Sequence, residues 1–169
     1  MSVYQDKYWA QLKELKTHII YLQGYAEHAD RWDKRVDIFL AVTSSTSIAA
    51  WAIWQKYPLV WSAIIALSQV ITAIKPFLPH KQRVKAISEL TDKFQNISLK
   101  CEKGWFAVAE GKLTEEEIHE LYISLKEESL LAEQNCLKNI VLPENKKILS
   151  EAERKADLYL TKTYHNISA

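Results

Sequence analysis

Two long stretches without a charged side chain limit what this chain can fold into. Residues 38–55 and 57–74 contain no Asp, Glu, Lys or Arg, whereas charges are dense in the rest of the sequence. As a helix, each stretch would be about 27 Å long, close to the hydrocarbon thickness of a bilayer, which is about 30 Å. Lys56 and Pro58 stand at the junction, and proline suits the first turn of a second helix. We therefore predict a two-span transmembrane helical hairpin over about 38–55 and 57–75.

Aromatic residues gather at both ends of this predicted hairpin, as they do at membrane–water interfaces. Trp32 and Phe77 mark one end. The residues that mark the other end are Trp51, Trp54, Tyr57 and Trp61. This clustering favours a membrane hairpin over the alternative, a buried hairpin in the core of a water-soluble helical bundle.

Basic residues outside the two spans predict the orientation. The turn carries Lys56 alone, whereas basic groups crowd both outer flanks: Arg31, Lys34 and Arg35 before the first span, and Lys75, His80, Lys81, Arg83 and Lys85 after the second. Flanks rich in Lys and Arg stay in the cytoplasm. The first sixteen residues lack the apolar core of a secretory signal. We expect a multi-pass membrane protein with both termini cytoplasmic.

Small residues form one stripe on each predicted span. The stripe on the first is Ala41, Ser45, Ala49 and Ala52, and that on the second is Ser62, Ala66, Gln69 and Ala73. In an antiparallel hairpin a single register pairs all eight and sets Gln69 opposite Ser45. Small residues let membrane helices approach closely, and a buried amide needs a partner. We predict that these stripes form the hairpin contact.

The first span also carries consecutive hydroxyl side chains at positions 43–47. Thr43 and Ser47 lie on the face away from the predicted hairpin contact, so they are candidates for lining a polar path or for contacting other subunits. The simpler alternative is that each hydroxyl bonds to a carbonyl of its own helix. The sequence leaves both open.

The remaining sequence predicts amphipathic helices. Apolar residues recur at helical spacing in three groups: Tyr4, Tyr8, Leu12, Leu15, Ile19, Leu22 and Ala26; Ile87, Leu90, Phe94, Ile97, Cys101 and Val108; and Ile118, Leu121, Leu125, Ala132, Cys136 and Ile140. A last amphipathic piece holds Ile148, Ala152, Ala156 and Tyr159. Gly111 is expected to close the second of these helices, a capping box at 114–117 to open the next, and Pro143 to end it.

With three glycines and four prolines, the chain has few of the turns that a sheet requires. The predicted fold is therefore all-α. We expect an N-terminal amphipathic cytoplasmic helix at 1–35, the hairpin at 36–78, and a cytoplasmic helical region at 79–169. The long amphipathic helices would pack as an antiparallel bundle or stalk.

Candidate chemistry is sparse. Glu116 and His119 share a helix face, but the further ligands of a di-iron bundle are not spaced for it. Cys101 and Cys136 predict neither a disulfide nor a metal cluster. The net charge is +1, with a basic segment followed by an acidic one, which favours facing helices over nucleic-acid binding. We predict no enzyme activity, cofactor, metal site or direct nucleic-acid contact.

The layout resembles the SLATT family of bacterial two-span effector proteins. The resemblance lies in the long first helix, the segment DRWDKR at 30–35, the tight hairpin, and the segments KQRVKAISELTDKF at 81–94 and GKLTEEEIHELYISLKEE at 111–128. It implies an oligomeric effector of antiphage or conflict systems that permeabilises the inner membrane. The implied partners are lipid, further copies of the chain, and a sensor protein or nucleotide signal. The alternatives are a non-pore membrane adaptor or scaffold, or a soluble helical bundle.

Overall fold

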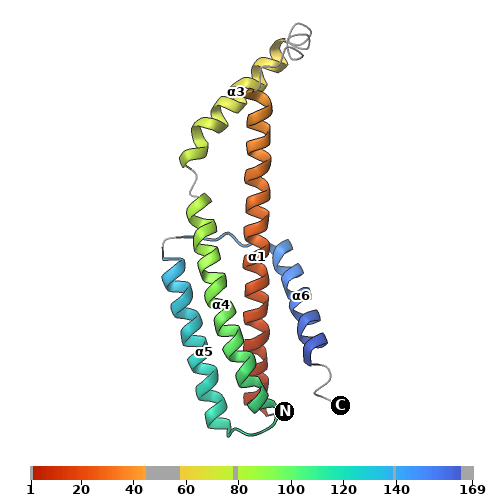
Figure 1. The fold of residues 1–169 in the computed structure, drawn as a ribbon, viewed down its shortest axis with the longest axis vertical. Coiled ribbons are helices and arrows are strands. Elements are labelled where there is room, and N and C mark those ends of the chain that lie inside the picture. The colour runs from red at the N-terminus through yellow and green to blue at the C-terminus, as the bar shows by residue number, and fades with distance from the viewer. Residues whose placement is uncertain (1, 45–57, 78–79, 139, 165–169) are drawn as a thin grey trace. The chain divides into compact units, whose positions relative to one another are not determined.

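The computed structural model describes residues 2–44, 58–77, 80–138 and 140–164, and these residues form helices joined by short connections, without strands (Figure 1). The elements in chain order are α1 (Val3–Ser44), α3 (Pro58–Ile74), the short 3₁₀ turn η1 (Lys75–Phe77), α4 (His80–Ala109), α5 (Glu115–Cys136) and α6 (Lys146–Tyr164). The predicted all-α class is confirmed.

The chain divides into two compact units. One unit joins Met1–Ala26 with Arg83–Ala169 and is called the bundle below; the other, Glu27–Gln82, is called the apolar unit. The predicted hairpin domain began at residue 36 and ended at residue 78. The apolar unit is longer because it includes the charged turns of α1 and of the 80–82 segment that flank the uncharged stretches.

The bundle is built around α1 and α4, which run antiparallel, with α5 on one side of the pair and α6 on the other (Figure 1). Its core comes from the predicted stripes and from three further apolar residues. The core residues are Tyr8, Leu12, Leu15, Ile19 and Leu22 of α1; Ala86, Ile87, Leu90, Phe94, Ile97, Cys101, Trp105 and Val108 of α4; Ile118, Leu125 and Ala132 of α5; and Ala152, Ala156 and Leu160 of α6. Ala86, Trp105 and Leu160 are the additions. Leu121 and Tyr159, which were predicted on core faces, are more than a third exposed.

A notch in α4 receives the ring of Tyr8. The Tyr8 hydroxyl donates a hydrogen bond of 3.0 Å to the carbonyl oxygen of Cys101. A Cβ added at Gly104 would lie 2.2 Å from that hydroxyl oxygen. Gly104 falls between Cys101 and Val108 of the predicted apolar stripe, where the sequence offers no apolar side chain, and it is the position that admits the tyrosine.

Local signals end α4 and begin α5 as predicted. Gly111, with φ of 66°, follows α4, and the amides of Gly111 and Lys112 donate to the carbonyls of Val108 and Ala107. This pattern is the Schellman motif, in which glycine supplies the left-handed conformation. Thr114 and Glu117 then form the predicted capping box: the Thr114 side chain accepts from the Glu117 amide, and the Glu117 carboxylate accepts from the Thr114 amide.

The helix α5 ends at Cys136, earlier than the predicted end at Pro143. The residues in between carry the chain across to Asn145, whose amide donates to the hydroxyl oxygen of Tyr21 at 3.1 Å. The Asn145 side chain in turn accepts from the amides of Lys147 and Ile148 and caps α6. The crossing to the far side of α1 therefore requires the residues that would otherwise have extended α5.

Candidate membrane-contacting surface

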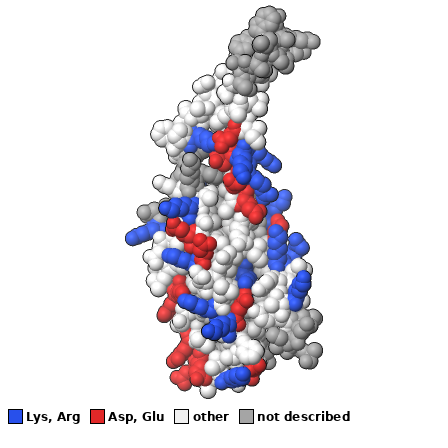
Figure 2. Space-filling view, in the orientation of Figure 1, with Lys and Arg blue, Asp and Glu red and all other residues white. Residues whose placement is uncertain are grey.

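The helix α3 exposes its apolar side chains. Together with η1 it forms a 20-residue segment, Pro58–Phe77, that is long and apolar enough to cross a membrane by length and composition. Among the described side chains of α3, Ser68 alone is buried. The large exposed side chains of this segment are Leu59, Val60, Leu67, Val70, Ile74 and Phe77. In Figure 2 the apolar unit shows a white surface, bordered on one side by blue and red charged side chains.

The last turns of α1 add to this surface. Ile38 and Val42 are 64% and 63% exposed, and Trp32 is 61% exposed. Of the first predicted span, 38–44 is described and continues α1 without a break, whereas 45–55 lies outside the described residues. One candidate span is therefore shown, and the two-span hairpin stays a prediction.

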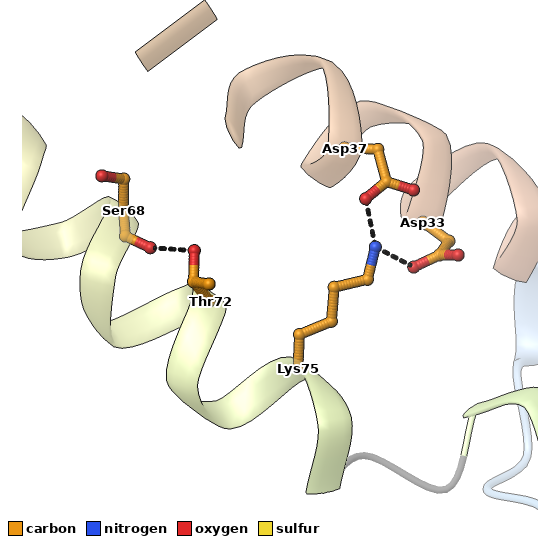
Figure 3. A network of polar contacts seen from close by, with 5 residues as sticks. All are labelled: Asp33, Asp37, Ser68, Thr72 and Lys75. Atoms are coloured by element: carbon orange, nitrogen blue, oxygen red, sulfur yellow. Dashed lines mark hydrogen bonds and ion pairs between the residues drawn. The ribbon is translucent and has the colours of Figure 1, made fainter. Parts of the chain in front are cut away.

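A charged network joins α1 to the end of the candidate span. The Lys75 ammonium contacts the carboxylates of both Asp33 and Asp37, and its nitrogen lies 3.1 Å from Asp33 Oδ1 (Figure 3). The Lys75 side chain is 30% exposed, so the network is partly shielded from solvent. The three charges lie where the uncharged sequence ends on both helices. They therefore mark one border of the apolar surface.

The less exposed face of α3 is not the face that carries the small residues, and the predicted contact with the first span stays a prediction because most of that span lies outside the described residues. The predicted contact residues of α3, Ser62, Ala66, Gln69 and Ala73, are exposed, and so is Ala41 of α1. The least exposed residues are Ile64, Ile65, Ser68 and Ile71. Ile64, Ser68 and Ile71 share a helical stripe with Lys75, whose ammonium contacts Asp33 and Asp37 of α1. The remaining predicted contact residues, Ser45, Ala49 and Ala52, lie outside the described residues.

The described hydroxyls of this unit bond to their own helices. Thr43 Oγ1 donates to the carbonyl oxygens of Phe39 and Leu40 at 3.0 and 3.1 Å, and Ser44 donates to that of Ala41 at 3.1 Å. The hydroxyls of α3 do the same, as Figure 3 shows for Thr72, and they are Ser62, Ser68 and Thr72. The hydrogen bonds of the simpler alternative are thus present at Thr43, and a polar path or subunit contact on this face stays a prediction. Ser47 lies outside the described residues.

The predicted interface aromatics are described at one end. Trp32 and Phe77 are exposed, as an interfacial position requires. Trp51, Trp54 and Tyr57 lie outside the described residues, and so does the side chain of Trp61.

Sequence reasoning missed the network of Asp33, Asp37 and Lys75, although a signal was present. Two acidic residues just before the first uncharged stretch and one lysine just after the second must meet if the chain folds back as a hairpin. An ion pair at this border shields all three charges beside an apolar surface.

Cys101 and Tyr8 are buried titratable side chains of the bundle. Within the described residues, no group of three or more His, Cys, Asp or Glu side chains could hold a metal ion. Cys101 is fully buried, and burial raises the pKa of its thiol to about 12. A thiol with so high a pKa is a poor nucleophile at neutral pH. The Tyr8 hydroxyl above it also has a raised pKa, chiefly because it is buried.

The case for membrane contact thus rests on an exposed apolar helix, on hydroxyls satisfied within their own helices, and on charges gathered at one border. The resemblance to the SLATT family stays a prediction drawn from the sequence. Comparisons with protein-family models, with curated proteins and with solved structures give no match for this chain.

Proposed function

We propose that this chain is an integral membrane protein of two spans, with both termini in the cytoplasm, whose copies associate and permeabilise the inner membrane. In line with the resemblance to the SLATT family, it would act as an effector of a bacterial antiphage or conflict system, controlled by a sensor protein or a nucleotide signal. The exposure of α3 is the observation that carries this proposal.

The cost of leaving α3 in water is large. Each big apolar side chain gains about 1.5–3 kcal/mol when it is fully removed from water, and six such side chains are exposed on Pro58–Phe77. A core helix of a soluble bundle would bury most of its side chains, but α3 buries Ser68 alone among those described. Lipid accounts for this surface without a second protein, so we favour the membrane over the soluble bundle.

Gln69 supports a contact with another membrane helix, which is either the first predicted span at Ser45 or a second copy of the chain. Its side-chain amide is exposed on α3 and has no hydrogen-bond partner within the described residues. An unpaired amide in hydrocarbon is costly, and glutamine side chains bond across membrane helices. The neighbouring small residues Ala66 and Ala73 would allow a second helix to approach.

The experiment begins with an alkaline carbonate wash of membranes from cells that express the protein. Retention in the pellet supports an integral hairpin, and release into the supernatant contradicts it. Dye leakage from liposomes then compares the wild type with a Thr43→Leu/Ser47→Leu variant and a Thr72→Leu control. We expect the double variant to lose leakage while the control retains it. Unchanged leakage from the double variant would show that Thr43 and Ser47 do not line a polar path.

A non-pore adaptor or scaffold is the second candidate, and the Thr43 hydroxyl favours it. Because that hydroxyl is bonded to two carbonyls of its own helix, it does not require a water-filled path. For an adaptor, the Thr43→Leu/Ser47→Leu change would be silent. Changes at Glu120 or Glu127, which are exposed on α5, would instead reduce partner recruitment.

A further inference from the structure

We propose that Arg31 and Arg35 form a binding site for the phosphate of an anionic phospholipid at the border of the apolar surface. This inference rests on the proposed membrane insertion and names the class of lipid that the border selects. The partner is the lipid headgroup in the bilayer, and not a soluble anion.

The spacing of the two arginines suits a single phosphate. They lie four residues apart on α1, so they are neighbours on one helix face, with Cβ atoms about 5–6 Å apart. Both side chains are exposed, and neither forms an ion pair within the described part of the chain. Planar guanidinium groups bind phosphate oxygens in pairs, and two neighbours can hold one phosphate between them.

The same face continues from charge into apolar side chains. Arg31, Arg35, Ile38 and Val42 follow one another at spacings of four, three and four, which keeps them on a single helical stripe. Ile38 and Val42 are each more than 60% exposed. Arg35 precedes Ile38 by about 4.5 Å of helix rise. A phospholipid bound along this stripe would place its phosphate at the arginines and its acyl chains at Ile38 and Val42.

Residues 27–37 together with Lys75 contain equal numbers of acidic and of Lys or Arg side chains. Three of the four carboxylates form ion pairs with lysines. Asp33 and Asp37 pair with Lys75 on the other face of α1, and Lys34 holds Asp30 at 2.7 Å. Glu27 is exposed one turn before Arg31 on the same helix face, at the end of the stripe farthest from the apolar residues, and no ion pair joins the two within the described residues. The stripe therefore places both arginines between its one carboxylate and Ile38, and Arg35 has no carboxylate one turn away on its own face.

Arginine next to an exposed tryptophan favours a lipid headgroup over free phosphate. Trp32 lies beside Arg31 in the chain and is 61% exposed, and tryptophan partitions to the headgroup layer. A free phosphate would use the guanidinium groups and gain nothing from Trp32, Ile38 or Val42. Because the stripe continues into apolar side chains, we infer that the ligand of the site is a lipid.

The test counts bound lipid on the full-length protein by native mass spectrometry after extraction in a mild detergent. Phosphatidylglycerol and phosphatidylcholine are titrated separately, and inorganic phosphate is added as a competitor. The variant is Arg31→Gln/Arg35→Gln. The control, Arg154→Gln/Lys162→Gln, removes the same charge from exposed positions of α6.

We expect phosphatidylglycerol to bind the wild type more tightly than phosphatidylcholine, and the arginine variant to lose about tenfold or more in that preference, since each basic residue near an anionic surface contributes about 1 kcal/mol. The control should keep the preference, and Arg31→Lys/Arg35→Lys should restore part of it. Salt should weaken binding.

Equal binding of the two lipids by a protein that is retained in the carbonate pellet overturns the lipid site and leaves membrane insertion standing. If an equal concentration of inorganic phosphate displaces phosphatidylglycerol, the site binds free phosphate and the proposal that it selects a lipid is overturned. Recovery of the wild type in the carbonate supernatant overturns both the site and the proposed function.

Discussion

Lys75 Nζ lies 3.1 Å from Asp33 Oδ1, which ties the end of the candidate span to the helix that precedes the first uncharged stretch. The same ammonium contacts Asp37. A single lysine thus serves two carboxylates that would otherwise face each other beside apolar surface.

Lys75→Met should lower the yield of membrane-integrated protein, because it leaves Asp33 and Asp37 without their cation. A partly exposed ion pair contributes up to about 1 kcal/mol, so we expect a loss of about two- to fivefold. Carbonate-resistant protein measured by blotting gives the yield. Adding Asp33→Asn and Asp37→Asn should restore it. Lys34→Met, which breaks the exposed pair with Asp30, is the control, and an equal loss there would contradict a special role for Lys75.

Gly104→Ala should destabilise the bundle, because the new methyl group would lie 2.2 Å from the Tyr8 hydroxyl oxygen. Overpacking of this kind costs about 1–3 kcal/mol, partly offset by the better helix propensity of alanine, about 1 kcal/mol. The Tyr8→Phe background removes the hydroxyl and leaves the ring carbon Cζ at 3.3 Å from the new methyl group, so there the same substitution should cost much less. The free energy of unfolding by urea is measured in mild detergent by circular dichroism for the wild type, Gly104→Ala, Tyr8→Phe and the double variant, which together form a double-mutant cycle. Equal effects of Gly104→Ala in both backgrounds would contradict the notch.

Acid should weaken the start of α5 through Glu117. Its carboxylate accepts hydrogen bonds from the Thr114 amide and hydroxyl, which lower its pKa. A lowered pKa in the folded state means that the contribution to stability is complete above the unfolded pKa, about 4.3, and is lost as the pH falls through the folded value. Glu117→Gln should therefore flatten the dependence of unfolding on pH between about 5 and 3. If the pH dependence of unfolding is the same in Glu117→Gln as in the wild type, the Glu117 carboxylate does not contribute to it.

Thr114→Ala tests the other half of the capping box at neutral pH. Loss of an N-cap hydroxyl costs about 1 kcal/mol, and Thr114→Ser should retain most of the stability. Amide exchange in the first turn of α5 should accelerate in the alanine variant, while exchange in α6 stays unchanged. Acceleration in both helices would point to a general loss of packing.

The two cysteines should react differently with a maleimide at pH 8. Cys101 is buried and the pKa of its thiol is raised to about 12, whereas Cys136 is half-buried at the end of α5. We expect one thiol to label in the folded protein and both to label in denaturant, with mass spectrometry locating the label. Labelling of Cys101 in the folded protein at the rate of Cys136 would contradict the described core.

The bundle was accessible to sequence reasoning because its stripes are long and its helix ends carry strong local signals. Thr114, Glu117 and Gly111 act on backbone groups within a few residues, so their roles can be read without knowing the fold. Trp105 and Leu160 were missed because their burial depends on tertiary packing, which for Trp105 includes the rings of Tyr8 and Trp9. The role of Gly104 was missed for the same reason: a gap in a stripe does not reveal which side chain fills it.

The apolar unit was harder to predict in detail. Small residues such as Ala66 and Ala73 predicted a contact face, but they are exposed, whereas Ile64, Ser68 and Ile71 are less exposed. These three share a stripe with Lys75, which contacts Asp33 and Asp37. Residue spacing identifies the possible stripes of a helix, but it does not show which of them is least exposed to solvent.

The fit of Tyr8 against Gly104 also has a consequence for evolution. The two residues fit each other, since the Tyr8 hydroxyl occupies the space that a methyl group at position 104 would fill. In related chains we therefore expect positions 8 and 104 to covary: a glycine at 104 wherever tyrosine stands at 8, and alanine or serine at 104 only where position 8 has become phenylalanine or a smaller residue.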